Sequence, residues 1–448
     1  MTTRTLFGTD GIRGRAGIEP ITPTTMARVA YAAGQYFSGS ARPTVLIGRD
    51  TRASSLMIER ALADGFAAAG FKILSAGVLP TPAIAYLTKQ YGATCGVMIT
   101  ASHNPWQDNG IKFFDAAGHK LSNEAESAIE SLMDHLNLLP ALPSIETLPD
   151  AAAQYSASLI ENVPSLVGLR IALDCAHGAA YQIAPDILHQ LGATVISIAA
   201  APDGQNINRD CGATHLAMLK QAVLESKADL GLALDGDADR LLMVDEQGRT
   251  IDGDQIMSLL AVKAFESGTL AHNSVVMTVM SNLGMEKYLD NRGIAMLRAA
   301  VGDRYVAEAM KNGGYTLGGE QSGHIIMAER SSTGDGLAAA LQILPLILQA
   351  KEAGQPASSV LVAFTPYPQK LKNITVSDVG ILEKPGVKAY LATQAEQIAG
   401  RGRILVRKSG TEPLIRVMVE ADDAALVESL CDEICSELLA QDAQRLSA

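Results

Sequence analysis

The chain has 448 residues, enough for three or four domains of about 100–150 residues each. Hydrophobic residues make up 48% and charged residues 19% of the sequence, a composition that excludes an intrinsically disordered chain. The net charge of −12 argues against a nucleic acid or an anionic membrane as partner, but not against a small anionic substrate that meets a local basic cluster.

Three further features indicate the cellular compartment. Residues 1–10 contain no apolar core of a signal peptide. The most apolar stretch, residues 337–350, is interrupted by Gln342 and Pro345 and is too short to span a bilayer. The five cysteines are odd in number and scattered, as is typical of free thiols in a reducing environment. We therefore expect a cytoplasmic protein without a membrane partner.

One pattern recurs three times along the chain: an amphipathic helix, a glycine and a short strand. The glycines are Gly70, Gly192 and Gly293, and each suits the left-handed conformation that ends a helix. A polar loop containing glycine follows each copy, and chance recurrence is the alternative to a true repeat. The pattern predicts an α/β protein with three successive similar domains and mainly parallel sheets.

The first of these loops contains Ser102. It follows the apolar run 96–99, which predicts a short buried strand, and Asn104-Pro105 then ends regular structure. A serine at the rim of a sheet, fixed at its backbone and open at its hydroxyl, suits a nucleophile or a phosphoryl carrier. The alternative is an ordinary turn serine that bonds its own backbone. In an extended chain the neighbouring His103 would point to the opposite face.

The second loop carries Asp235, Asp237 and Asp239 between two apolar runs that predict flanking strands. If the three carboxylates converge, each pair at ~5 Å and a dielectric of ~20 costs ~3 kcal/mol, so convergence requires a divalent cation. Oxygen ligands favour Mg²⁺ or Ca²⁺. A calcium-hand loop would place Glu246 at its last ligand position, but Arg240 stands where that loop needs glycine. A solvated acidic turn is the remaining alternative.

The third and fourth stretches suggest substrate contacts. Glu320 and Ser322 lie on one side of an extended chain, as two contacts to sugar hydroxyls would require, although a glycine turn before a strand explains them equally well. Near the end of the chain, small and cationic residues form the backbone concavity expected for a phosphate, unless they make a polar hairpin turn. These residues are Arg407, Ser409, Gly410, Thr411 and Arg416.

Domain boundaries follow from composition and pattern. Residues 140–149 are rich in proline and read as a linker. The predicted domains span residues 1–150, 151–253, 254–365 and 366–448. The last one differs, with strands near 404–407 and 414–420 and a helix from about residue 422, and we expect a smaller α+β domain.

Taken together in this order and spacing, the four stretches resemble the α-D-phosphohexomutase superfamily over the whole chain. Residues 7–14 (FGTDGIRG) and 320–324 (EQSGH) are most similar to the bacterial branch that acts on glucosamine phosphates. One departure is Ala238, where glycine is usual; it removes no ligand.

The resemblance implies a phosphoserine at Ser102 and a Mg²⁺ ion held by its phosphate together with Asp235, Asp237 and Asp239. It implies sugar contacts from Glu320 and Ser322 and phosphate contacts from the last domain. The roles it suggests for the other residues are a general base for Lys112, with His103 and His324 as lesser candidates, orientation of the Ser102 loop for Arg13, and contact with phosphoserine or substrate for Arg240.

The implied reaction interconverts glucosamine 6-phosphate and glucosamine 1-phosphate, a step toward UDP-N-acetylglucosamine. A hexose or hexosamine 1,6-bisphosphate serves as intermediate and activator, and a homodimer is a further expectation. Preference for mannose or glucose phosphates is the nearest alternative. A hydrolase with an aspartyl nucleophile in residues 235–237 and a non-catalytic cation-binding module are the two others.

Overall fold

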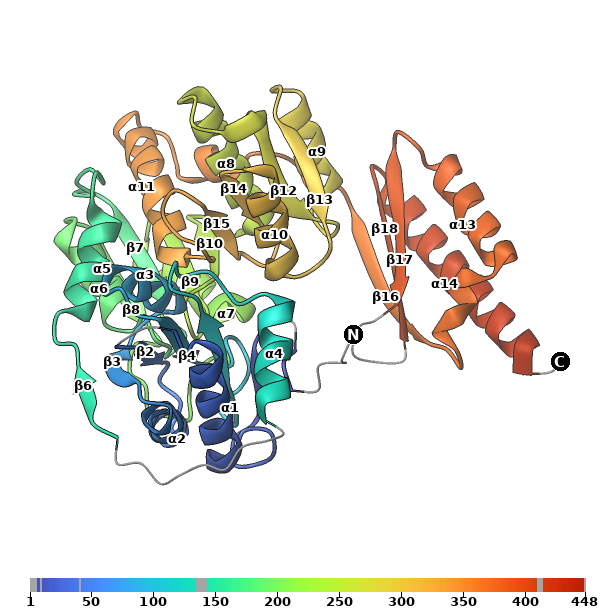
Figure 1. Ribbon diagram of the computed structural model, residues 1–448. Helices are drawn as coiled ribbons and strands as arrows, with labels where there is room; N and C mark the ends of the chain where they lie inside the picture. The colour runs from blue at the N-terminus through green and yellow to red at the C-terminus, as the bar shows by residue number, and fades with distance from the viewer. Residues whose placement is uncertain (1–5, 9, 40–41, 134–142, 409–413, 447–448) are drawn as a thin grey trace. The chain divides into compact units, whose positions relative to one another are not determined.

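The computed structural model describes residues 6–8, 10–39, 42–133, 143–408 and 414–446 (Figure 1). Two compact units make up the chain, one of residues 1–280 and 292–363 and the other of residues 281–291 and 364–448. The larger unit contains three of the four β-sheets, and each of these combines parallel pairs with an antiparallel edge.

The first sheet has the strand order β1-β5-β4-β2-β3-β6. Helices α1, α2 and α4 pack together, while α3 packs against β2 and β4. The strands are β1 Ile12–Arg15, β2 Thr44–Arg49, β3 Lys72–Val78, β4 Cys95–Ile99, β5 Asp108–Phe114 and β6 Ile145–Thr147, and the helices are α1 Pro23–Tyr36, α2 Ser55–Ala68, α3 Thr81–Gln90 and α4 Asn123–Met133. Apolar side chains of α1, α2 and α4 and of one face of the sheet form a single buried core.

The second sheet, β11-β10-β9-β7-β8, and the third, β13-β12-β14-β15, repeat this plan. Elements of the second are α5 Ala151–Ile160, β7 Arg170–Asp174, α6 Ile183–Gln190, β8 Thr194–Ile198, α7 Ala217–Ser226, β9 Leu230–Leu234, β10 Leu241–Asp245 and β11 Thr250–Ile251. Those of the third are α8 Gly253–Glu266, β12 Ser274–Thr278, β13 Ala295–Ala299, α10 Asp303–Gly313, β14 Leu317–Gly319, β15 Ile325–Met327, α11 Gly336–Glu352 and α12 Ser358–Leu361.

The repeat predicted from the glycines is confirmed. Gly70, Gly192 and Gly293 all have positive φ, between +77° and +90°, and β3, β8 and β13 begin within two residues of them. In each sheet the predicted functional loop joins a strand of the parallel set to an antiparallel neighbour: β4 to β5, β9 to β10 and β14 to β15. The three loops therefore occupy equivalent places in three similar sheets, where the hydrogen-bond pattern changes.

The smaller unit has the antiparallel sheet β16-β18-β17, with α14 packed on β16 and β18. Its elements are α9 Leu283–Asp290, β16 Gln369–Thr375, α13 Pro385–Gln397, β17 Gly402–Lys408, β18 Leu414–Ala421 and α14 Ala424–Leu446. The predicted pair of strands followed by a helix is confirmed, and the apolar positions 430, 434 and 438 of α14 are buried.

Two expectations about the whole chain can be compared with the structure. All five cysteines are free thiols and buried. Among the helices of the described ranges, none has the length and apolarity that crossing a membrane requires.

Candidate active site

Two of the three loops of the larger unit meet directly. The loop after β4 (residues 100–107, the Ser102 loop) and the turn between β9 and β10 (residues 235–240, the aspartate loop) touch through Ser102, whose hydroxyl donates a hydrogen bond to Asp235 Oδ2 at 2.7 Å. The two residues are 133 positions apart in sequence. Strand ends in two successive sheets thus place an alcohol against a carboxylate.

Ser102 adopts the left-handed conformation, with φ +51°, and is 1% exposed. Its backbone N–H donates to Thr100 Oγ1 at 2.8 Å. Because of this left-handed turn, the imidazole of His103 lies on the same side as the Ser102 hydroxyl, with Nδ1 3.4 Å from Ser102 Oγ. The expectation that His103 points to the opposite face was therefore wrong, because it assumed an extended backbone at Ser102.

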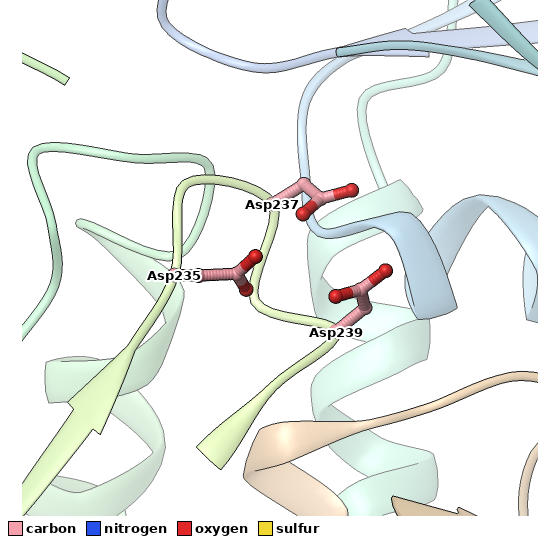
Figure 2. Close-up of side chains that lie close together, drawn as sticks. All are labelled: Asp235, Asp237 and Asp239. Atoms are coloured by element: carbon pink, nitrogen blue, oxygen red, sulfur yellow. The ribbon is translucent and has the colours of Figure 1, made fainter. Parts of the chain in front are cut away.

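The aspartate loop holds its three carboxylates in one cluster (Figure 2). Asp235, Asp237 and Asp239 are at most 2% exposed, and each offers an oxygen atom within 4.8 Å of the others. The flanking strands β9 and β10 are those predicted. Ala238, between the second and third aspartates, has φ +56°, a conformation that favours glycine.

This cluster has the properties of a divalent-cation site. The Oδ1 atoms of Asp237 and Asp239 are buried and have no hydrogen-bond partner among the described residues. Burial, and then the charges of Asp239 and Asp237, raise the pKa of Asp235 to about 8. A hard divalent cation would coordinate the unpartnered oxygens and would allow all three neighbouring carboxylates to be ionised at once. The residues present therefore fit an all-oxygen Mg²⁺ site.

Lys112 of β5 is placed among these carboxylates. Its ammonium donates to Asp237 Oδ2 at 2.9 Å and Asp239 Oδ2 at 3.0 Å, and lies 3.1 Å from Asp10 Oδ2. Burial would lower the pKa of Lys112, but the charges of Asp10, Asp237 and Asp239 outweigh it and raise that pKa well above its ordinary value. A general base needs a lowered pKa, so Lys112 is held here as a cation.

Three charged residues that the sequence did not single out complete this network. Asp10 accepts from Lys120 Nζ at 2.6 Å, and Lys120 also bonds Asp303 at the start of α10. Asp10 lies in the opening FGTDGIRG stretch, which offered a signal for it. Nothing local marks Lys120 or Asp303, because their meeting depends on chain segments 183 positions apart.

Thr81, at the start of α3, is another residue that the sequence did not reveal. Its hydroxyl donates to Asp237 Oδ2 at 2.5 Å, and its N–H donates to Asp237 O at 3.0 Å. The first turn of α3 therefore fixes the middle aspartate from the neighbouring sheet.

His324 approaches the same aspartates from the third sheet. Its Nδ1 lies 3.6 Å from Asp239 Oδ1, and its Nε2 accepts from Gly334 N at 3.0 Å. Burial would lower the pKa of His324, but Asp239 and Asp303 outweigh it and raise that pKa.

Arg240 and the loop after β14 (residues 320–324) lie beside the cluster. The N–H of Arg240 donates to Asp235 Oδ1 at 3.3 Å, and its guanidinium interacts electrostatically with Glu320. Ser322 Oγ lies 3.4 Å from Glu320 Oε2, so these two side chains are on one side as predicted. Glu320 is half-buried and Ser322 is exposed, so both can reach a ligand.

Arg13, for which orientation of the Ser102 loop is expected, forms an ion pair in the larger unit. Within the described ranges its guanidinium bonds Asp10, and no bond to the Ser102 loop is present. Arg13 and Arg240 nevertheless both act on His103: burial, then these two charges, lower the pKa of His103 to about 4. The imidazole beside Ser102 is therefore neutral near pH 7.

The smaller unit contains the predicted arginine pair. Arg407 and Arg416 face each other across β17 and β18, and burial together with the charge of Arg416 lowers the pKa of Arg407. Two cations in directly opposite positions repel unless an anion joins them. Ser409, Gly410 and Thr411 lie outside the described residues.

Comparison with protein families gives four consecutive matches to one family. They are described as phosphoglucomutase/phosphomannomutase alpha/beta/alpha domain I at residues 4–138, domain II at residues 152–248, domain III at residues 252–367 and the C-terminal domain at residues 371–437.

Two relatives resemble the chain over nearly its full length. A phosphoglucosamine mutase of Zymomonas mobilis is 51% identical over 440 residues, covering 97% of this chain and 98% of the relative. A phosphoglucosamine mutase of Rhodospirillum rubrum is 49% identical over 448 residues, with 97% and 98% covered.

Solved structures share the fold at lower identity. A phosphoglucomutase/phosphomannomutase family protein from Burkholderia thailandensis has a TM-score of 0.84 at 22% identity, covering 99% of this chain and 97% of its own. Aspergillus fumigatus N-acetylphosphoglucosamine mutase, solved with GlcNAc-6P and magnesium, has a TM-score of 0.67 at 18% identity, with 98% and 96% covered.

Proposed function

The chain belongs to the phosphoglucomutase/phosphomannomutase family, and on that premise we propose that it interconverts glucosamine 6-phosphate and glucosamine 1-phosphate. As a member of this family it is an isomerase that moves a phosphoryl group within a sugar. The choice of amino sugar rests on relatives about half identical to it, all named phosphoglucosamine mutase. Phosphomannomutase or phosphoglucomutase activity at the same site is the second candidate.

The observation that supports this proposal most directly is the bond from Ser102 Oγ to Asp235 Oδ2 at 2.7 Å. It places a hydroxyl, fixed by a left-handed backbone, at the edge of a buried carboxylate cluster with two unsatisfied oxygens. A phosphoryl group carried by that hydroxyl would be dianionic near neutral pH and would be repelled by carboxylates alone.

Asp235, Asp237 and Asp239 would hold a Mg²⁺ ion together with a phosphate oxygen on Ser102. Bound there, the ion would neutralise negative charge on the phosphoryl group during its transfer. The protein's own cations would do the same from other sides: Lys112 from β5 and Arg240 from the aspartate loop.

In the proposed reaction, phosphoserine 102 donates its phosphoryl group to the free hydroxyl of the sugar monophosphate. The bond from phosphorus to Ser102 Oγ breaks and the bond to the sugar oxygen forms. The proton of the sugar hydroxyl passes to a base, and Ser102 Oγ takes up a proton to become a hydroxyl. The product is a 1,6-bisphosphate. This intermediate reorients in the site and transfers its other phosphoryl group to Ser102. Water has to be excluded throughout, because hydrolysis would end the cycle.

Three residues are candidates for the base in this scheme: Lys112, His103 and His324. The resemblance assigns the role to Lys112, which must first lose the proton that three carboxylates stabilise. His103 is neutral near pH 7 and lies 3.4 Å from Ser102 Oγ. Lys112 therefore stays a prediction, with His103 and His324 as alternatives.

Several further residues are proposed to contact the substrate. Glu320 and Ser322 would hold sugar hydroxyls, and Arg240 would contact the phosphoserine or the substrate. Arg407 and Arg416, with Ser409, Gly410 and Thr411, would bind the phosphate that is not being transferred. Arg13, bonded to Asp10, would act on the Ser102 loop through its charge.

The test is a product assay with purified protein, Mg²⁺ and a trace of glucosamine 1,6-bisphosphate. Glucosamine, glucose and mannose 6-phosphates are compared in parallel, and we expect glucosamine phosphate to give the highest kcat/KM. Intact-mass measurement should show one phosphate on the wild-type protein. Both the phosphate and the mutase activity should be lost in Ser102→Ala. Both should remain in Ser131→Ala, which changes an exposed serine of α4. Full turnover by Ser102→Ala would refute the mechanism, and steady phosphate release without bisphosphate would favour a hydrolase.

Three further expectations belong to this proposal. We propose domains at residues 1–150, 151–253, 254–365 and 366–448, to be tested by limited proteolysis. We propose cytoplasmic location, which the free thiols support. A homodimer stays a prediction for sedimentation to test.

A further inference from the structure

A buried arginine lies directly beneath the Ser102 loop. Arg52, three residues after the end of β2, has a side chain that is 0% exposed. Its Nη2 donates to Ser102 O and to Asn104 O, both at 2.9 Å, and its Nη1 donates to Pro105 O at 3.2 Å. A guanidinium is the side chain whose fixed fork can serve several carbonyls at once.

A second donor reaches the same two carbonyls from the second sheet. Asn208, 7% exposed, donates through Nδ2 to Ser102 O at 2.8 Å and to Asn104 O at 3.1 Å. Each carbonyl oxygen therefore accepts two hydrogen bonds, one from each side chain. Four bonds between two donors and two acceptors leave the backbone of this loop little freedom.

A carboxylate at a strand end holds Arg52 directly, and another one supports Asn208 through the backbone of Ala176. Asp50, directly after β2, forms an ion pair with Arg52 Nε at 3.0 Å and accepts from Arg52 N at 3.0 Å. Asp174, at the end of β7, accepts from Ala176 N at 2.9 Å, and Ala176 O in turn accepts from Asn208 N at 2.9 Å. Strands β2 and β7 hold the same place in their sheets, so each of the first two repeats contributes one support.

The aspartate loop closes the remaining side of this arrangement. A Cβ atom on Gly236 would lie 2.5 Å from Ser102 O and 2.7 Å from Asn208 Nδ2, so only glycine permits the approach. The loop that carries the cation ligands is therefore packed on the same carbonyl that Arg52 and Asn208 grip. Moving that carbonyl would move Ser102 Oγ relative to Asp235.

We propose that Arg52 and Asn208 are positioning residues for phosphoryl transfer. By holding the carbonyl oxygens of Ser102 and Asn104, they keep Ser102 in its left-handed conformation and its oxygen at the aspartate cluster during both half-reactions. Neither residue touches substrate, and the inference rests on the proposed function. A purely structural role would instead affect the folded fraction and leave each folded molecule fully active.

The experiment compares Arg52→Lys and Asn208→Gly with two matched controls. Lysine keeps the charge but has no fork to span three carbonyls. Glycine suits the φ of +58° at Asn208 and removes the side chain with its amide donor. The controls are Arg49→Lys, whose arginine pairs with Glu59, and Asn206→Gly, whose asparagine bonds Ala201 O.

Mutase turnover, KM and the release of inorganic phosphate per turnover are measured on folded, Mg²⁺-saturated enzyme. We expect each positioning variant to lose at least tenfold in kcat with KM within twofold of wild type. A larger share of its phosphoenzyme should lose phosphate to water, because the group is no longer aimed at the sugar. The double variant should lose little more than the worse single variant, since both act on the same carbonyls.

The control variants should match wild type in all three measurements. If Arg52→Lys fails to fold, Asn208→Gly decides the question. Folded variants with kcat and phosphate loss within twofold of wild type would overturn this inference alone. A wild-type protein without turnover on any hexose phosphate would overturn the proposed function, and this inference with it.

Discussion

Ala238 has a backbone conformation that is unfavourable for a residue with a Cβ atom. It has φ +56° in the aspartate loop and is fully buried. Left-handed backbone costs a residue with a Cβ about 1–2 kcal/mol, and replacement by glycine removes that cost while adding entropy to the unfolded chain. We expect Ala238→Gly to raise the free energy of unfolding by about 0.5–1 kcal/mol, measured by urea denaturation.

The control for this change is Ala233→Gly, in the neighbouring strand β9. Ala233 is equally buried but does not have positive φ, so glycine there should cost about 1 kcal/mol. Equal destabilisation by both changes would show that the lost methyl contact, and not the backbone, decides the outcome.

Asp174 predicts a pH dependence of stability. Burial raises its pKa from 3.8 to about 6, although the N–H groups of Gly212 and Ala176 partly oppose this. The folded protein therefore binds this proton more tightly than the unfolded chain does. The resulting stability, on the order of 3 kcal/mol for two pKa units, is present below pH 4 and is lost as the pH rises through 6.

Asp174→Asn should flatten the fall in the free energy of unfolding between pH 4 and pH 6.5, because no proton is then exchanged at this position. Its absolute stability should be lower, since the amide replaces one of two acceptors for backbone N–H groups. Asp203→Asn, at an exposed aspartate that accepts from Gln205 N, should keep the wild-type slope. An unchanged slope in Asp174→Asn would contradict the assignment.

At the scale of elements, strand ends were readable from sequence. The apolar runs before Ser102 and Asp235 predicted β4 and β9, because buried parallel strands are apolar on both faces. Two elements of the smaller unit were not predicted, β16 and α13. In α13 only Val387 and Gln394 are fully buried, while Tyr390 and Leu391 pack on the core in part, so the apolar face is short and contains a polar residue.

The partners within the site were less predictable than its loops. Ser102 and the three aspartates were singled out because each stands in a distinctive local pattern, whereas Lys112 was named only through the family resemblance. Asp303 and Asn208 act across 100 to 200 positions of chain, and no local pattern indicates which distant charge or amide a fold will bring together. Arg52 resembles any arginine after a strand until its three carbonyl partners are in place.

The strand pair β17–β18 supports a prediction about anion binding. Arg416 and Arg407 are opposite one another, and a phosphate between them would make charge-assisted bonds that offset their repulsion. Arg416→Met should raise KM for the sugar phosphate about 10- to 100-fold, as expected for the loss of about 1.5–3 kcal/mol of binding. Steady-state kinetics with glucosamine 1-phosphate measures this.

Arg401→Met is the matched control in the same unit. Arg401 is exposed and already paired with Asp422 at 2.9 Å, so its loss should leave KM unchanged. A KM for Arg416→Met within twofold of wild type would remove the arginine pair from the substrate site.

The whole molecule consists of two compact units, and the aspartate cluster lies entirely in the larger one. A ligand stabilises only the unit whose folded state binds it. Calorimetry should therefore resolve two unfolding transitions, of which Mg²⁺ shifts one. At 100 times its Kd the ion should add about 2.7 kcal/mol to the larger unit, and EDTA should reverse the shift.

Asp235→Asn separates cation binding from folding in this experiment. The pKa of about 8 keeps Asp235 largely protonated at pH 7 without a cation, so a neutral amide should change the stability of the metal-free protein little. A cation, however, needs the ionised carboxylate, and the variant should lose the Mg²⁺ shift. A shift of equal size in wild type and Asp235→Asn would show that the Asp235 carboxylate is not a ligand of the ion and would contradict the three-aspartate site.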